Sequence, residues 1–192
     1  MNVEALLTST TLVALAEIGD KTQLLSFVLA ARLRKPLPII AGIFVATVLN
    51  HALAGSVGVW LAQLVPPQSL PWITGILFIA FGLWVLRPDA LDDDPKIYRA
   101  GAFVTALIAF FLAEMGDKTQ LATVALAAQF QGALLAVVVG TTLGMMLANV
   151  PAVIIGERLA QRLPLNAIRW AAAGVFILTG GVTLLGASGL LY

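Results

Sequence analysis

The 192-residue sequence has no cysteine and very little charge. Without cysteine there can be no disulfide, no cysteine-based zinc or iron–sulfur site and no thiol nucleophile. Only 11% of the residues are charged and 60% are apolar, whereas a soluble domain has about 25% charged residues. This composition excludes a disordered chain and a basic protein with a nucleic-acid partner, and it argues against an ordinary soluble enzyme.

The sequence is rich in long apolar stretches. A helix needs roughly 20 mainly apolar residues to cross about 30 Å of hydrocarbon. The stretches that qualify cover residues 5–31, 37–63, 70–87, 101–129, 132–156 and 166–190. We therefore expect an all-α polytopic membrane protein with six transmembrane helices in one membrane domain, surrounded by the lipid bilayer.

Outside the two lysines within the stretches, the basic residues fall in alternate connections. The first, third and fifth connections carry Arg32, Arg34, Lys35, Arg87, Lys96, Arg99, Arg158, Arg162 and Arg169. The other connections and both termini have none. Since Lys and Arg accumulate on the cytoplasmic side, both termini are expected outside the cytoplasm. The acidic run Asp92–Asp94 in the third connection is interpreted as a solvated loop, with metal attraction at a cytoplasmic mouth as the alternative.

The chain repeats itself at an offset of 97 residues. The segment Ala16–Ala31 reads AEIGDKTQLLSFVLAA and Ala113–Ala128 reads AEMGDKTQLATVALAA, with eleven of sixteen positions identical. The matching Glu, Gly, Asp, Lys, Thr and Gln cannot result from a shared apolar bias. We expect two three-helix repeats, residues 1–95 and 96–192. Because each has an odd number of spans, the second is inverted relative to the first, as in many secondary transporters.

Each repeat carries two acids and one lysine inside its first apolar stretch. An intramembrane charge costs roughly 2.5–3.5 kcal/mol, so six of them indicate a functional site. These residues are Glu17, Asp20, Lys21, Glu114, Asp117 and Lys118. Four carboxylates and two lysines sum to a charge of −2, which one divalent cation or two protons would neutralise. Each lysine is expected to pair with an acid of the same or the opposite repeat.

Neutral groups around these acids complete a donor set suited to a hard divalent cation. The candidate oxygen ligands are Thr22, Gln23, Thr119 and Gln120, with Asn50 and Asn149 at corresponding positions in the second and fifth stretches. Gly19 and Gly116 permit a break in the helix that would free backbone carbonyls. The alternative is that the charges are salt bridges that only fix packing. The single histidine, His51, is expected to pack or hydrogen-bond; as a ligand it would favour Mn²⁺ over Ca²⁺.

The two Glu-x-Gly-Asp-Lys-Thr motifs, at 17–22 and 114–119, resemble the signature of the Golgi-type calcium/manganese:proton exchanger family, whose short bacterial members are manganese exporters. The resemblance covers essentially the whole chain. It implies that Glu17, Asp20, Glu114 and Asp117 bind the metal, that transport runs out of the cytoplasm, and that the chain resides in a bacterial inner membrane.

We therefore expect a secondary antiporter, not an enzyme, that exports Mn²⁺ or alternatively Ca²⁺ in exchange for H⁺ or Na⁺. It would work by alternating access at the carboxylates and need no resident cofactor. Two other functions stay open at this point. Paired membrane aspartates could form an intramembrane aspartyl protease, although a dyad needs only one acid on each side. A passive cation channel is the second.

Overall fold

The computed structural model describes residues 2–88, 96–156 and 164–189, and within these ranges every regular element is helical. The first half contains α1 (Val3–Glu17), α2 (Lys21–Leu33), α3 (Pro36–Leu64) and α4 (Leu70–Val85). The second half contains α5 (Ala102–Glu114), α6 (Lys118–Gln129), the short 3₁₀ helix η1 (Gln131–Ala133), α7 (Leu134–Ile155) and α9 (Leu165–Ala187). The predicted all-α class is therefore confirmed, while the run Asp92–Asp94 lies outside the described residues.

Among the helices in the described ranges, three are long and apolar enough to cross a membrane. They are α3, the continuous stretch Gln131–Ile155 that includes α7, and α9. These three correspond to the predicted second, fifth and sixth spans. The predicted third span corresponds to α4, a shorter apolar helix. The predicted first and fourth spans each consist of two shorter helices in tandem, α1 followed by α2 and α5 followed by α6.

The two interrupted helices break with the same backbone geometry. Ile18 has φ −70° and ψ 112°, Gly19 has φ +85°, and the amide of Asp20 donates to the carbonyl of Glu17 at 3.1 Å. These are the features of a type II turn, whose third residue needs a positive φ and therefore favours glycine. Met115, with φ −61° and ψ 118°, and Gly116, with φ +75°, repeat the arrangement in the second half. The Glu-x-Gly-Asp part of each motif is thus a turn set into a helix.

Equivalent glycines hold α3 against α5 and α7 against α1. A Cβ atom added at Gly42 would lie 2.6 Å from the carbonyl oxygen of Phe103, and one at Gly140 would lie 2.6 Å from that of Leu6. Phe103 follows Leu6 by the same 97-residue offset that relates the two motifs. Small residues let helix backbones approach this closely in membranes. Each half therefore supplies a long helix that packs on the first short helix of the other half.

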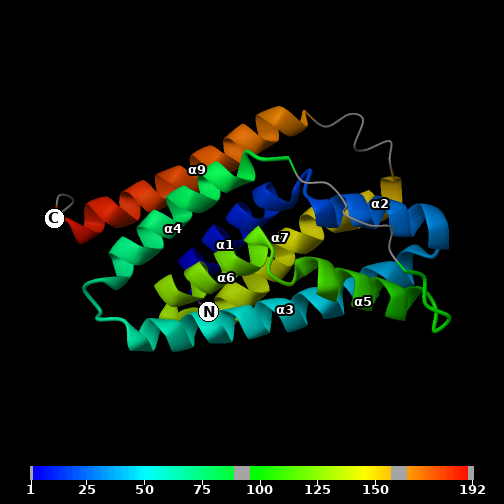
Figure 1. Cartoon of the computed structure of the whole chain (residues 1–192), viewed down its shortest axis with the longest axis horizontal. Coiled ribbons are helices and arrows are strands. Elements are labelled where there is room, and N and C mark those ends of the chain that lie inside the picture. The colour runs from blue at the N-terminus through cyan, green and yellow to red at the C-terminus, as the bar shows by residue number, and fades with distance from the viewer. Residues whose placement is uncertain (1, 89–95, 157–163, 190–192) are drawn as a thin grey trace.

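The last helix of each half pairs with its counterpart and lies against one part of the bundle. Gly75 of α4 and Gly180 of α9 face each other, since a Cβ atom at Gly180 would lie 2.5 Å from the carbonyl oxygen of Gly75. The α4–α9 pair packs mainly on α6 and α1, whereas α2 and α5 pack on α7 and α3. In Figure 1 the pair therefore occupies the left of the bundle, with α2 and α5 at the right.

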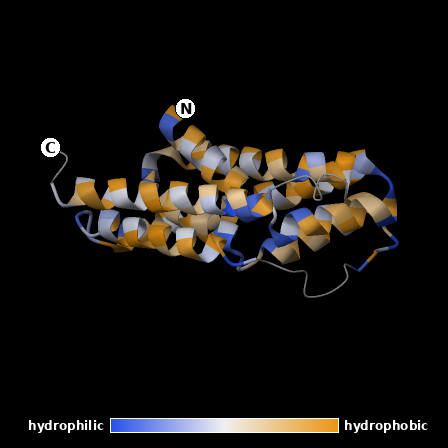
Figure 2. Ribbon diagram, turned by 90° about the horizontal axis from the view of Figure 1, so that it is seen from above, coloured by the Kyte–Doolittle hydropathy of each residue, from blue (hydrophilic) through white to orange (hydrophobic). Residues whose placement is uncertain are grey.

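Two apolar cores lie at opposite parts of the bundle. One is built from α1, α4, α6, α7 and α9 around Phe78 and Phe176, and the other from α2, α3, α5 and the end of α7 around Leu29 and Phe110. Figure 2 shows hydrophilic segments at the ends of the bundle and a further hydrophilic band midway along it.

The close approach of α7 to α1 generates a stability prediction. We expect Gly140→Ala to lower the free energy of unfolding by about 1–3 kcal/mol, because the new methyl group would overpack the interface with α1. Gly174→Ala is the matched control, since a Cβ atom there meets nothing within 4 Å. Thermal unfolding of the two purified variants in detergent tests this. Equal melting temperatures would contradict the close packing.

Candidate metal site

The two helix breaks meet in the middle of the bundle and exchange ion pairs. Lys21 Nζ lies 3.1 Å from Asp117 Oδ1, and Lys118 Nζ lies 2.7 Å from Asp20 Oδ1. Each lysine thus pairs with the aspartate of the opposite repeat, one of the two possibilities that the sequence left open. A buried charge needs such a partner because desolvation is otherwise costly. The aspartates and lysines neutralise one another in this arrangement.

Three of the four predicted carboxylates form a compact cluster. Glu17, Glu114 and Asp117 are all buried, and each offers an oxygen that lies within 4.8 Å of the other two. Asp20, the fourth predicted ligand, is equally buried but pairs with Lys118. Because each aspartate is paired with a lysine, the charge of −2 that the site carries when every group is ionised belongs to Glu17 and Glu114.

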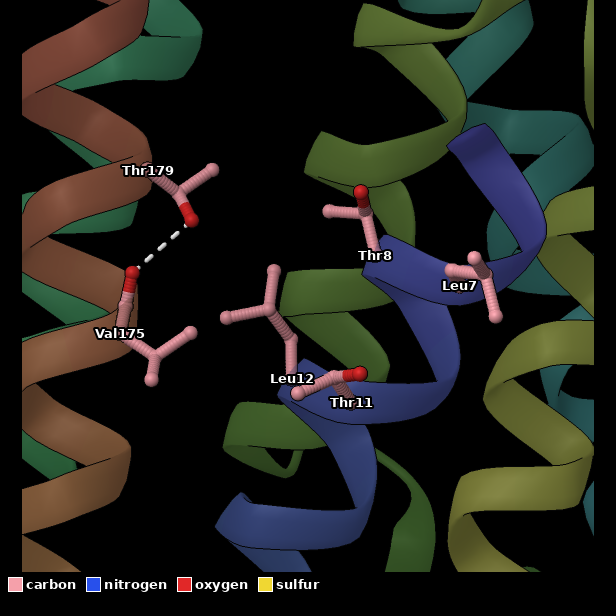
Figure 3. Close-up of a pocket in the computed structure, with 6 residues that line it drawn as sticks. All are labelled: Leu7, Thr8, Thr11, Leu12, Val175 and Thr179. Atoms are coloured by element: carbon pink, nitrogen blue, oxygen red, sulfur yellow. Dashed lines mark hydrogen bonds between the residues drawn. The ribbon is translucent and has the colours of Figure 1, made fainter. Parts of the chain in front are cut away.

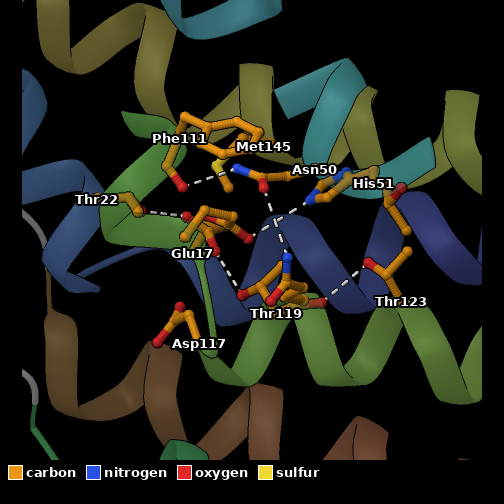
Figure 4. A network of polar contacts seen from close by, with 12 residues as sticks. Glu17, Thr22, Asn50, His51, Phe111, Asp117, Thr119, Thr123 and Met145 are labelled. Carbon is orange, nitrogen blue, oxygen red and sulfur yellow. Dashed lines mark hydrogen bonds and ion pairs between the residues drawn. The ribbon is translucent and has the colours of Figure 1, made fainter. Parts of the chain in front are cut away.

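Glu17 receives hydroxyl donors from both repeats. The side chain of Thr22 donates to Oε2 of Glu17, and that of Thr119 donates to Oε1 at 2.5 Å. Figure 4 shows Glu17 between these two threonines, with Asp117 nearby. Both predicted threonines therefore reach the site. They donate to the same carboxylate, that of Glu17, and not each to the glutamate of its own repeat.

Glu114 has a different neighbour. His51 of α3 is completely buried, and its Nε2 lies 3.5 Å from Oε1 of Glu114. Sequence reasoning assigned this histidine to packing or hydrogen bonding because the second repeat has Val150 where a counterpart would stand. The only signal for a place at the site was that it follows Asn50, which does have a counterpart.

Gln23 and Gln120 each accept a hydrogen bond from the backbone of the turn in their own motif. The side-chain oxygen of Gln23 accepts a hydrogen bond from the amide of Gly19 at 2.9 Å, and that of Gln120 accepts from the amide of Gly116 at 2.7 Å. The Gln23 amide group also donates to the carbonyl of Ala148 at 3.0 Å. In this conformation the predicted glutamine oxygens are occupied by backbone donors, so the glutamines stabilise the breaks.

The two asparagines link the long helices to the breaks. Asn50 of α3 donates to the carbonyl of Phe111 at 3.1 Å, and its oxygen accepts from Gln120 at 3.5 Å. Asn149 of α7 accepts from Ser26 at 2.8 Å and donates to the carbonyl of Met145 at 3.0 Å. Both therefore lie at the site's margin and hold neighbouring helices in register.

This arrangement is chemically suited to a hard divalent cation. Buried carboxylate oxygens stand close together, and the helices α1 and α5 both end at the cluster. Discontinuous helices coordinate cations in this way in membrane transporters. A single dication would neutralise Glu17 and Glu114, and so would one proton on each.

The sequence is similar to known proteins along nearly its full length. A family model described as "Divalent cation/proton antiporter GDT1" matches twice, over residues 5–93 and 102–190. A Vibrio cholerae protein named "Putative manganese exporter" is 56% identical over 170 residues, covering 88% of this chain and 85% of that protein. "GDT1-like protein 5" of Arabidopsis thaliana is 27% identical over 210 residues, covering 89% of this chain and 91% of that protein. No solved structure matches this chain.

The reciprocal ion pairs predict unequal effects of removing each lysine. In the Lys118–Asp20 pair the side chains are 5% and 0% exposed, whereas Lys21 in the other pair is 25% exposed. We expect Lys118→Met to destabilise the protein by about 3–5 kcal/mol, because a buried aspartate loses its partner. Lys21→Met should cost less, because water solvates that pair more.

The double variant Asp20→Asn with Lys118→Met controls for packing. It removes both charges at once and should recover most of the lost stability. Thermal unfolding in detergent measures all four proteins. A double variant as unstable as Lys118→Met alone would show that the lysine acts through packing and not through its charge.

Proposed function

Because the chain belongs to the divalent cation/proton antiporter family GDT1, we propose that it exports Mn²⁺ from the cytoplasm in exchange for protons. The observation that carries this proposal is the pair of buried glutamates, Glu17 and Glu114, which come from the two helix breaks and lack a lysine partner. The family is a transporter family, so the protein is not an enzyme and the intramembrane protease alternative is set aside.

Charge balance supports exchange over simple binding. With the aspartates paired to lysines, the glutamates accept either one dication or two protons, and both loaded forms are neutral. A neutral site can move between the two sides of a bilayer at much lower cost than a charged one. An empty, fully ionised site carries a charge of −2, and this charge opposes the conformational change that would expose the site to the other side. This difference couples metal movement to proton movement and disfavours a passive channel.

The choice of Mn²⁺ rests on the chemistry of the site and on the Vibrio cholerae relative named "Putative manganese exporter". Ca²⁺ is the alternative substrate, since carboxylate and carbonyl oxygens also suit it. Protons are favoured as the counter-ion by the family description, with Na⁺ as the alternative. Neither choice requires a resident cofactor.

We propose that the chain is two inverted repeats of three spans each. Three observations support this: the family model matches each half once, both motifs adopt the same turn, and the Gly42 and Gly140 contacts are equivalent. The placement of basic residues supports both termini on the extracytoplasmic side, here of a bacterial inner membrane. The connection at 34–35 and the described segment 96–101 lie at one end of Figure 1, and the turn at 65–69 lies at the other.

In that orientation, the structure corresponds to a state closed toward the outside. The short helices α1 and α6 would lie on the extracytoplasmic side of the breaks, and the α4–α9 pair packs over them. A groove of about 280 Å³ between α1 and α9, lined by Thr8, Thr11 and Thr179 among others, follows this seam (Figure 3). We propose that the α4–α9 pair moves toward α2 and α5 to open the outer side, giving alternating access.

Reconstituted transport tests the site. In proteoliposomes with an imposed pH gradient and a trapped metal-sensitive dye, the wild-type protein should move Mn²⁺ against its own gradient. Mg²⁺, Ca²⁺ and the presence of Na⁺ are compared in the same assay. Glu17→Gln and Glu114→Gln should each reduce transport to background, because an amide cannot neutralise the dication.

The matched control is Glu4→Gln, which removes the same charge from an exposed position at the start of α1. It should transport as the wild type does. Mn²⁺ movement only down its own gradient, unaffected by the pH difference, would indicate a channel. Full activity in Glu17→Gln would remove that residue from the site.

Proton competition predicts the direction of the pH dependence. Since protons and Mn²⁺ compete for the same carboxylates, lowering the pH should weaken Mn²⁺ binding. Because the two glutamates are neutralised either by one Mn²⁺ or by one proton each, we expect two protons to be exchanged for each Mn²⁺. Calorimetric titration of the purified protein in several buffers between about pH 8 and about pH 5.5 measures both affinity and proton release. An affinity that stays constant over this range would contradict proton coupling at these residues.

A further inference from the structure

His51 stands out among the buried polar side chains of the bundle. Both of its ring nitrogens are inaccessible to solvent, and neither makes a hydrogen bond to any residue in the described ranges. Buried polar groups in proteins nearly always have a partner. The same holds for both carboxylate oxygens of Glu114, which make no hydrogen bond with any described residue. Two unsatisfied groups therefore face each other across the middle of the site.

The separation of these two groups suits a shared cation better than a direct hydrogen bond. His51 Nε2 and Glu114 Oε1 are 3.5 Å apart, whereas hydrogen bonds from nitrogen to oxygen cluster at about 2.9–3.0 Å. Donor atoms that stand about 2.0–2.6 Å from one metal ion are about 3–4 Å from each other. The observed spacing is thus that of neighbouring ligands in a coordination shell.

The surroundings hold the ring in this place. Asn50, the residue before His51, is tied to the carbonyl of Phe111 near the end of α5 and to Gln120 of α6. These contacts tie α3 to the helices on either side of the second break, where Glu114 lies. Figure 4 shows His51 directed toward the carboxylates, on the side away from Thr22.

We propose that His51 Nε2 is a ligand of the transported cation and gives the site its preference for first-row transition dications over Mg²⁺ and Ca²⁺. This rests on the proposed function. Mg²⁺ and Ca²⁺ are bound by oxygen donors, whereas imidazole suits transition metals. Because the second repeat has Val150 at the corresponding position, the duplicated motifs supply paired oxygens and a single nitrogen, and hence one asymmetric site.

The sole histidine makes a direct test possible. Wild-type protein is prepared with a histidine-free purification tag, with ¹⁴N-histidine or with ¹⁵N-histidine, so that the isotope changes at one residue only. Electron spin echo modulation of bound Mn²⁺ should show a ¹⁴N coupling that is replaced by a ¹⁵N coupling on labelling. A spectrum without nitrogen coupling, or one that labelling leaves unchanged, would overturn the proposal. This measurement needs no variant that could misfold.

Transport selectivity gives a second readout. In proteoliposomes, Co²⁺ should inhibit Mn²⁺ transport at lower concentrations than Ca²⁺ does. In His51→Gln, which replaces the nitrogen with an amide oxygen, we expect the preference for Mn²⁺ over Ca²⁺ to fall by roughly tenfold or more, a loss of the size seen when metal sites are altered. Continued Ca²⁺ transport would show that the variant is folded. Val150→Ala, at the corresponding position, is the control and should keep the wild-type preference.

The two proposals fail in different ways. A wild-type protein that transports Mn²⁺ but shows no histidine coupling, or a His51→Gln variant with unchanged selectivity, would overturn the role of His51 and leave manganese export intact. A wild-type protein that neither binds nor transports Mn²⁺ would overturn both.

Discussion

The structure depends on the requirement that charges removed from water be paired. Each half of the chain places two acids and one lysine at a helix break, and the ion pairs among these groups run between the halves, because Lys21 pairs with Asp117 and Lys118 with Asp20. This reciprocal pairing draws the two breaks together in the middle of the bundle. It also determines which acids are left over, and those two glutamates face each other where a cation can be held.

Much of this site follows from sequence by local rules. Glycine between two acids predicts a break. In each motif Glu, Gly and Asp stand at the first, third and fourth positions of a type II turn. Other features depend on contacts between distant segments. That Gln23 and Gln120 turn back to the amides of Gly19 and Gly116, and that Thr22 and Thr119 converge on one glutamate, depends on how the repeats dock. The position of His51 beside Glu114 could not be predicted, because internal symmetry, the strongest signal in the sequence, cannot identify a residue without a counterpart.

Two nearly identical motifs thus occupy unequal surroundings. Glu17 is oriented by two hydroxyl groups, while Glu114 faces an imidazole ring. The unequal placement of the α4–α9 pair, which packs on α1 and α6 more than on α2 and α5, extends this inequality to the whole bundle. Under the proposed inverted-repeat arrangement, exchanging the roles of the two halves would give the second conformation that alternating access requires.

The reciprocal pairing also has a consequence for how the protein is made. A ribosome completes the first half of the chain before Lys118 exists, so the newly inserted Asp20 cannot form its ion pair with Lys118 at that stage. The two ion pairs between the breaks can therefore form only after the second half has been inserted beside the first, so a half-length chain cannot form them on its own.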